Sequence, residues 1–163
     1  MTTGAGVSDA VDLREATAAD VPRIAALIAM GDAKKPMDAA TAEAEGHHPA
    51  YAEAFRRVSA SEANHLFVAE QGGRIVGTYQ LTVLPGIAER GRTRGKIESV
   101  HVDPALRGSG IGAAMMRHAI VTAREKGIGL VELSSNKSRT DAHRFYERLG
   151  FAKSHEGFKM ALD

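Results

Sequence analysis

A run of glycines between a predicted strand and a predicted helix is the feature that most restricts how this chain can fold. Residues 96–102 (KIESVHV) alternate and carry β-branched side chains, which predicts a strand. Glycines then stand at positions 108, 110 and 112, and an apolar helical pattern runs on to about Lys126, where Gly127 ends it. A helix start leaves about four backbone N–H groups without intrahelical acceptors, and glycine lets an anion approach them closely. We expect this turn either to bind a phosphate, in particular a pyrophosphate, or to serve only as a tight strand-to-helix connection.

The remaining elements follow from hydrophobic spacing and from turn residues. Apolar residues at helical spacing predict helices near residues 21–30, 51–58 and 138–149, and the small, polar stretch 31–50 is expected to be a loop with at most one turn of helix. Residues rich in β-branched and aromatic side chains, or alternating in polarity, predict strands at 11–15, 65–70, 74–84, 130–135, 151–154 and 157–162. Gly72 and Gly73 join two of these strands as a hairpin.

This order of elements predicts an α/β (α+β) fold with a mixed, mostly antiparallel central sheet flanked by helices. The length of 163 residues suits a single domain, which we assign to residues 11–163. Residues 1–10 lack both a basic segment and an apolar run, so we expect a disordered N-terminal tail.

Composition excludes several functional classes. The chain has 21 Lys and Arg against 20 Asp and Glu, so no global field favours nucleic acid or an anionic membrane, and any anion site has to be local. Cysteine is absent, which removes thiolate nucleophiles and cysteine-ligated metals. No run of 18 apolar residues suggests a membrane span, and we expect a cytoplasmic protein. The histidines show no H-E-x-x-H spacing, so no metal is expected, and no G-x-S-x-G elbow supports a Ser-His-Asp triad.

Two nucleotide-binding alternatives apply to the glycine turn. A P-loop requires a lysine directly after its last glycine, and none follows here. Gly108, Gly110 and Ala113 do satisfy the dinucleotide pattern G-x-G-x-x-A, and Glu132 stands about 20 residues further on. However, only about 50 residues follow the motif, too few for the remaining βαβ units, and antiparallel hairpins precede it.

The stretch from Val102 to Gly112 (VDPALRGSGIG) resembles the acetyl-CoA motif [RQ]-x-x-G-x-[GA] of the GNAT superfamily of N-acetyltransferases. The segment AHRFYERLGF, residues 142–151, is similar to the second signature of that family, and LREATAADVPRIAALI is similar to its usual opening strand and helix. The resemblance covers residues 11–162, nearly the whole chain.

The resemblance implies acetyl-CoA as co-substrate and assigns residues to it. The turn would hold the pyrophosphate, the backbone of the preceding strand would bond the pantetheine arm, and that strand and 130–135 would splay apart to leave a slot. The implied cofactor residues are Val100, His101, Val102, Arg107, Gly108, Ser109, Gly110, Ile111, Gly112, Ala113, Asn136 and Tyr146.

Two residues are candidates for the chemistry. Tyr146 matches the family tyrosine near the thioester sulfur, where its phenol would protonate the departing thiolate. A free amine is scarce at neutral pH because its pKa is near 10.4, so a base is needed, or a chain of water. Glu98 is our candidate for that base, because alternation along the strand places it on the face of Val100 and Val102. His101 has the opposite parity, which speaks against it as the base.

The leading hypothesis, implied by the resemblance, is an enzyme that transfers acetyl directly from acetyl-CoA to a primary amine. The absence of a cysteine that could carry an acyl intermediate agrees with direct transfer. The acceptor would be a small molecule or a peptide, and dimers are common in the family. An acyl-CoA-binding sensor without turnover is the alternative, and a dinucleotide-binding protein is the third hypothesis.

Overall fold

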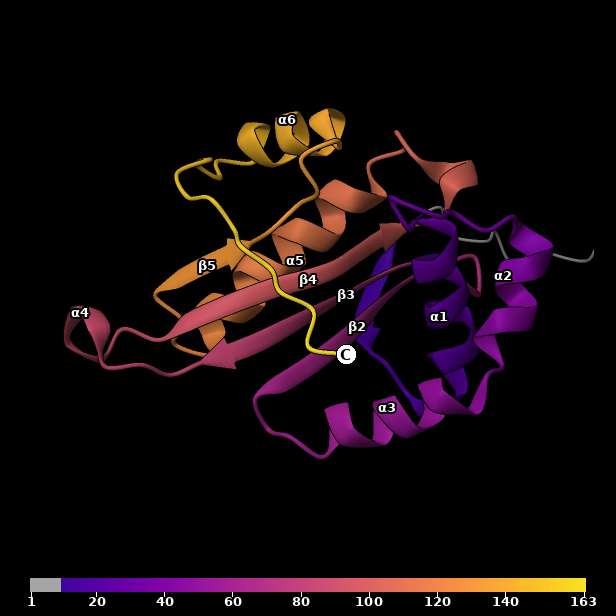
Figure 1. Ribbon diagram of the computed structural model, residues 1–163, viewed down its shortest axis with the longest axis horizontal. Helices are drawn as coiled ribbons and strands as arrows, with labels where there is room; N and C mark the ends of the chain where they lie inside the picture. Colours follow the sequence, from indigo (N-terminus) through magenta and orange to yellow (C-terminus); the bar gives the residue numbers. More distant parts are fainter. Residues whose placement is uncertain (1–9) are drawn as a thin grey trace, which may run out of the picture.

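A five-stranded sheet runs through the centre of the computed structural model, which describes residues 10–163 (Figure 1). The strands lie in the order of the chain: β1 (Asp12–Glu15), β2 (Asn64–Gln71), β3 (Arg74–Leu84), β4 (Arg94–Val102) and β5 (Leu130–Leu133). The pairs β1–β2, β2–β3 and β3–β4 are antiparallel, and the pair β4–β5 is parallel. The expected mixed, mostly antiparallel sheet is therefore confirmed. The tail expected at residues 1–10 lies outside the described residues except for Ala10.

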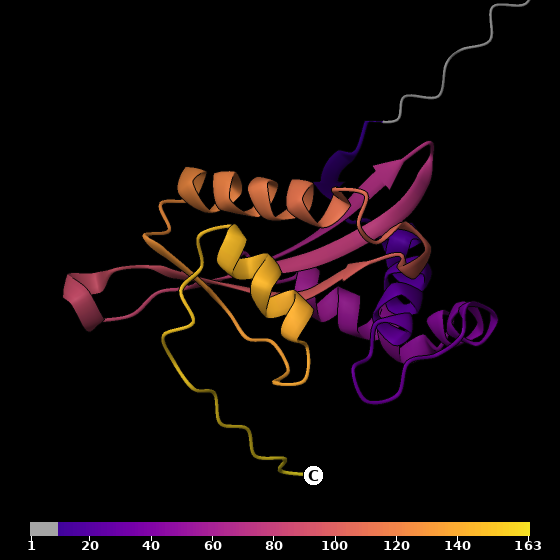
Figure 2. The same cartoon turned by 90° about the horizontal axis from the view of Figure 1, so that it is seen from above.

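Helices cover both faces of this sheet. The helices are α1 (Val21–Met30), α2 (Ala39–Gly46), α3 (Pro49–Ser59), α4 (Ala88–Gly91), α5 (Ile111–Glu125) and α6 (Thr140–Arg148), with 3₁₀ turns η1 (Ala18–Asp20) and η2 (Pro104–Leu106). Figure 2 shows α5 on one side of the sheet and α1, α2 and α3 on the other. None of the helices within residues 10–163 is long and apolar enough to cross a membrane.

The expectation of a loop over residues 31–50 is wrong, because α2 forms within it. Asp38 caps this helix by accepting hydrogen bonds from the Thr41 backbone and hydroxyl. The helix carries almost no apolar pattern, since it buries only Ala42 and Gly46. A Cβ at Gly46 would lie 2.2 Å from the Pro22 carbonyl oxygen, so glycine lets α2 pack directly on the start of α1.

The main core lies between the sheet and α5. Tyr79, Leu81, Ile97 and Met115 are fully buried there, and the Tyr79 ring stacks on Phe67. A buried phenol needs a partner, and the Tyr79 hydroxyl lies 2.7 Å from Nδ1 of His118 on α5. This contact places His118 in the packing of the core.

The two strands expected at 151–154 and 157–162 do not form. Residues 151–163 carry no secondary structure, and Figure 2 shows this segment leading away from the helices. Phe158, Met160 and Leu162 are more than four-fifths exposed. Their alternation is a local property, whereas a strand also needs a paired edge, and no other strand of the described residues pairs with this segment.

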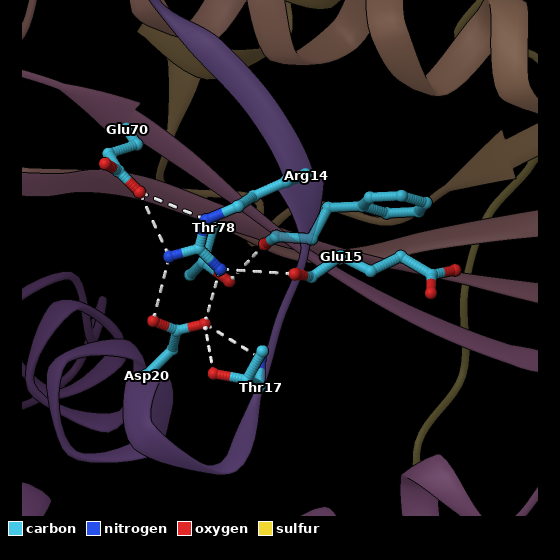
Figure 3. Close-up of polar contacts among 7 residues, drawn as sticks. Arg14, Glu15, Thr17, Asp20, Glu70 and Thr78 are labelled. Carbon is cyan, nitrogen blue, oxygen red and sulfur yellow. Dashed lines mark hydrogen bonds and ion pairs between the residues drawn. The ribbon is translucent and has the colours of Figure 1, made fainter. Parts of the chain in front are cut away.

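An arginine in β1 ties the edge of the sheet to the start of α1 (Figure 3). The Arg14 guanidinium lies 2.7 and 3.0 Å from the two carboxylate oxygens of Asp20 and 3.0 Å from Glu70 on β2. Asp20 also accepts a hydrogen bond of 2.8 Å from the Thr17 backbone, closing the capping box ahead of α1. The Arg14 hydrogen bonds hold the pKa of the Asp20 carboxyl below its ordinary value of 3.8, against the opposing effect of burial.

Replacing Asp20 by asparagine is expected to lower the free energy of unfolding at pH 7 by about 1–3 kcal/mol, because the partly buried Arg14 guanidinium loses one of its two charged partners. Since the folded pKa is lowered, the stabilisation is present above pH 3.8 and is lost as the pH falls below that value. Urea unfolding of the wild type and Asp20→Asn between pH 7 and pH 3 measures both effects. Asp12→Asn, at an exposed position of β1, is the control. A difference that stays constant down to pH 3 would contradict a stabilisation that depends on the Asp20 charge.

Candidate functional site

Strands β4 and β5 separate at the middle of β4, and this opens the candidate site. Their parallel pairing runs from Arg94 opposite Leu130 to Ile97 opposite Leu133, where β5 ends. Strand β4 continues to Val102 and remains paired there with β3. From Glu98 onward, therefore, the edge of β4 that faces away from β3 has no neighbouring strand among the described residues, and its backbone N–H and C=O groups are available to a ligand.

A bulge in β4 lies at this point of separation. Gln80 pairs with Glu98 and Thr78 with His101, so three steps along β4 correspond to two steps along β3. Ser99, inside the bulge, has a φ of 52°, in the left-handed region that few residues other than glycine adopt. Because Gln80 and Thr78 lie on one face of β3, their partners Glu98 and His101 lie on one face of β4. The expectation that His101 has the opposite parity to Glu98 is therefore wrong.

The same bulge corrects the expected neighbours of Glu98. Val102 pairs with Gly77, which lies on the opposite face of β3 from Thr78 and Gln80. Val100 and Val102 pack against the core cluster that includes Ile111 and Met115. Glu98 thus does not share their face, and it lies on the side of the sheet covered by α1.

A cavity of about 240 Å³ occupies the space that the splayed strands leave. Its walls come from β4, from the segment after β5, from α6 and from the segment after α1. The residues that line it are Ile28, Gly31, Asp32, Ala33, Ile97, Glu98, Ser99, Val100, His101, Leu133, Ser134, Ser135, Asn136, Arg139 and Tyr146. Of the residues that the sequence assigned to the site, Glu98, Val100, His101, Asn136 and Tyr146 meet here.

Tyr146 brings an unpaired phenol to this cavity. Its ring packs edge-on against Phe145 and Phe151 at 5.2 and 6.0 Å between centroids, and its hydroxyl makes none of the side-chain hydrogen bonds found within residues 10–163. Burial raises the pKa of Tyr146 above its ordinary value of 10.0, against a smaller lowering by Arg139. The phenol is therefore protonated at neutral pH and is a proton donor.

His101 lies against the end of α1. A Cβ added to Gly31 would fall 2.2 Å from the His101 Nδ1, so glycine makes room for the imidazole. The ring nitrogens take part in none of the hydrogen bonds found in the described part of the chain. Burial, with smaller contributions from Arg139 and Arg107, lowers the pKa of His101 to about 4, and Asp32 partly opposes them. The imidazole is neutral at pH 7.

Two further groups were missed by the sequence reasoning. Arg139, just before α6, lines the cavity and forms none of the ion pairs found within residues 10–163. The Ser135 hydroxyl is the one buried side-chain polar atom without a hydrogen-bond partner in the described residues. An unpaired cation and an orphaned hydroxyl in one cavity indicate a polar ligand. No motif marks either residue, because each depends on the splay of β5 from β4.

Glu98 has protein partners as well as a place in the cavity. Its carboxylate lies 3.4 Å from the Lys96 ammonium and 3.4 Å from the Gln80 amide nitrogen, and its side chain is 39% exposed. Asn136 uses its side-chain oxygen within its own loop, where it accepts hydrogen bonds from the backbone and hydroxyl of Ser138.

The glycine turn lies beyond the other end of the exposed stretch of β4. Gly108 and Gly110 have φ values of 81° and 88°, and a Cβ on either would meet nothing within 4 Å, so their outer faces are open. Gly110 caps α5, and the first intrahelical bond runs from the Ala114 N–H to the Gly110 carbonyl. The N–H groups of Ile111, Gly112 and Ala113 are therefore without helical acceptors, which makes this turn suitable for an anion.

Arg92, in the loop before β4, and Arg94, at the start of that strand, have partners away from the cavity. Arg92 donates to the Gly129 carbonyl and pairs with Glu89, and Arg94 pairs with Glu132 on β5. This loop leads into the first residue of β4, whereas the cavity is lined by the stretch of β4 from Ile97 to His101. No group of three or more histidine, cysteine or carboxylate side chains in residues 10–163 is placed to hold a metal ion.

Residues 34–151 match the family model described as the Acetyltransferase (GNAT) family. A glucosamine 6-phosphate N-acetyltransferase from Trypanosoma brucei brucei is 40% identical over 98 residues, and an aminoalkylphosphonate N-acetyltransferase from Salmonella typhimurium (strain LT2) is 38% identical over 98 residues. Each match covers 60% of this chain and 63% of the relative's length.

Among solved structures, a protein described as a transcriptional regulator from Bacillus halodurans C-125 has a TM-score of 0.83 at 36% identity, and the match covers 94% of this chain and 100% of that one.

Proposed function

The chain belongs to the GNAT family of acetyltransferases, and from this membership and its site we propose that it transfers an acetyl group from acetyl-CoA directly to a primary amine. The observation that carries the proposal is the separation of β4 from β5, because it leaves an unpaired strand edge between a cavity and the glycine turn. The residues that would contact acetyl-CoA thus follow the free edge of β4 from the cavity to the turn.

Acetyl-CoA would be held mainly by backbone groups. The pantetheine arm would bond the free edge of β4 at Val100, His101 and Val102, as an added strand would. The pyrophosphate would lie on the turn from Arg107 to Gly112 with Ala113, where open glycine faces, free N–H groups and a cation coincide. Asn136 and Tyr146 would complete the site at its acyl end.

Replacing Gly110 by valine is expected to weaken CoA binding at least tenfold. The φ of 88° strains a β-branched residue by about 1–3 kcal/mol, and its side chain would fill the open face where the phosphate belongs. Calorimetric titration of CoA into the variant measures the affinity. Gly86→Val is the control, because a Cβ there also meets nothing within 4 Å and the backbone is not left-handed. An unchanged affinity would speak against the pyrophosphate assignment.

In the proposed reaction Tyr146 supplies the proton that the leaving thiolate needs. Burial keeps the phenol protonated at neutral pH, and its hydroxyl is free of partners within the described residues. Glu98, directly or through water, would take a proton from the acceptor ammonium, since its half-exposed carboxylate reaches both the cavity and solvent.

Tyr146→Phe is expected to lower kcat by about 10²–10⁴-fold, because general acid catalysis contributes on that scale, while the Kd for CoA changes little. Steady-state release of free thiol, together with a CoA titration, separates the two quantities. Tyr51→Phe is a matched control, because the Tyr51 hydroxyl donates to Glu45 on α2 and Tyr51 does not line the cavity. Equal activity of Tyr146→Phe and the wild type would remove Tyr146 from the chemistry.

The acceptor that fits this cavity is a small amine that also carries a phosphate or phosphonate. Arg139 is a cation without an acidic partner in the described residues, and it lies in the same cavity as the acidic Glu98 and Asp32. Two of the curated relatives are named for amines of this kind, a sugar phosphate and an aminoalkylphosphonate. The ammonium group of such an acceptor could pair with Glu98 or Asp32, and its phosphate or phosphonate could pair with Arg139.

Thiol release from acetyl-CoA across a panel of amines tests the proposal. Amines with a phosphate or phosphonate are expected to turn over with a lower KM than uncharged amines of similar size. Binding of CoA with no thiol release for any amine would instead indicate a sensor, and binding of NAD without CoA would indicate a dinucleotide protein.

Arg139→Gln is expected to raise the KM of a phosphonate-bearing amine roughly 10–100-fold, since a charge-assisted hydrogen bond contributes about 1.5–3 kcal/mol. The KM of an uncharged amine should change little. Arg57→Gln, at an exposed position on α3, is the matched control. A raised KM for acetyl-CoA with an unchanged KM for the acceptor would assign Arg139 to the co-substrate and contradict this acceptor class.

A further inference from the structure

His101 is a partly buried, neutral imidazole in the reaction cavity, and the proposed chemistry leaves its side chain unused. The bulge at Ser99 turns its side chain to the same face of β4 as Glu98, and Gly31 leaves the space that the ring occupies. None of the hydrogen bonds of residues 10–163 engages its nitrogens. A neutral imidazole with a free lone pair beside an acyl-transfer site can accept a proton.

We propose that His101 is a catalytic base, which takes the proton released by the attacking nitrogen as the new C–N bond forms. This inference rests on the proposed function. The proposed function uses only the backbone of His101, whereas this inference gives its side chain a role in the chemistry.

The proton balance requires two acceptors. The acceptor amine enters as an ammonium and leaves as an amide, so its nitrogen loses two protons, and the CoA sulfur regains only one. Glu98 takes the first proton and releases it to solvent. The nitrogen then bonds to the thioester carbon, and its second proton passes to His101. The C–S bond breaks as the sulfur takes the bonding electron pair and the Tyr146 proton, and the His101 imidazolium returns its proton to the Tyr146 phenolate through water.

The charged groups around His101 make the basicity of its imidazole depend on bound substrates. Arg107 precedes α5, Arg139 precedes α6, and Asp32 follows α1, and these three act on the imidazole together with burial. Glu98 shares its face of β4, and Tyr146 faces the cavity from α6. A pyrophosphate at Arg107 and a phosphonate at Arg139 would offset the two cations that disfavour the imidazolium. His101 would therefore become more basic only when both substrates are bound.

Histidine NMR titrations of the wild-type protein test this coupling without turnover. The resonance lost in His101→Gln identifies His101, and its pKa in the free protein is expected near 4. With saturating CoA and an aminoalkylphosphonate, which form an unreactive ternary complex, that pKa is expected to rise by about one unit or more. An unchanged or lowered pKa would overturn the proposal.

Kinetics supply the second test. His101→Gln is expected to lower kcat by about 10²-fold or more with an unchanged KM for acetyl-CoA, and to change the pH dependence of kcat. Added imidazole should restore part of the kcat of His101→Ala, which a purely structural role would not allow. His47→Gln, at an exposed position after α2, is the matched control.

The outcomes separate the role of His101 from the function on which it rests. If the wild type releases no thiol with any amine, the proposed function fails. If the wild type is active and His101→Gln has the same kcat and pH profile, the proposed function stands and the role of His101 is wrong.

Discussion

The loss of hydrogen bonding between β4 and β5 after Ile97 and Leu133 is the constraint on which the candidate site depends. Strand β4 is held in place by β3 along its whole length, so its other edge is both unpaired and fixed. The bulge at Ser99 lies at the same point and determines which side chains face the cavity. The end of the β4–β5 pairing thus opens the cavity, and the bulge at the same point of β4 determines which side chains line it.

The parts of the fold that follow from short-range signals could be predicted from the sequence. Glycines that adopt a left-handed backbone, at 72, 73, 110 and 127, marked turns and helix ends correctly. The family resemblance named Tyr146 and Asn136, and both line the cavity. Helix α2 was missed because it has almost no apolar face, and the two closing strands were wrong because alternation does not supply a partner edge.

The side-chain geometry of the site could not be predicted, for a more specific reason. Counting alternate residues along β4 assumes an unbroken pleat, and a single extra residue reverses the face of everything beyond it. Ser99 has no sequence signature for such a bulge, so His101 was assigned to the wrong face. Arg139 and Ser135 lie in a segment without regular structure, and only the position of α6 brings them to the cavity.

The unpaired edge of β4 has a consequence for how such a protein can diverge. In the proposed arrangement main-chain atoms grip the acyl carrier, whereas the groups turned toward the acceptor are side chains from separate segments, among them Asp32 and Arg139. Mutations of these side chains can therefore change the specificity for the amine while the binding of acetyl-CoA is unchanged. Because different groups bind the two substrates, such a fold can acquire new amine acceptors while it keeps acetyl transfer.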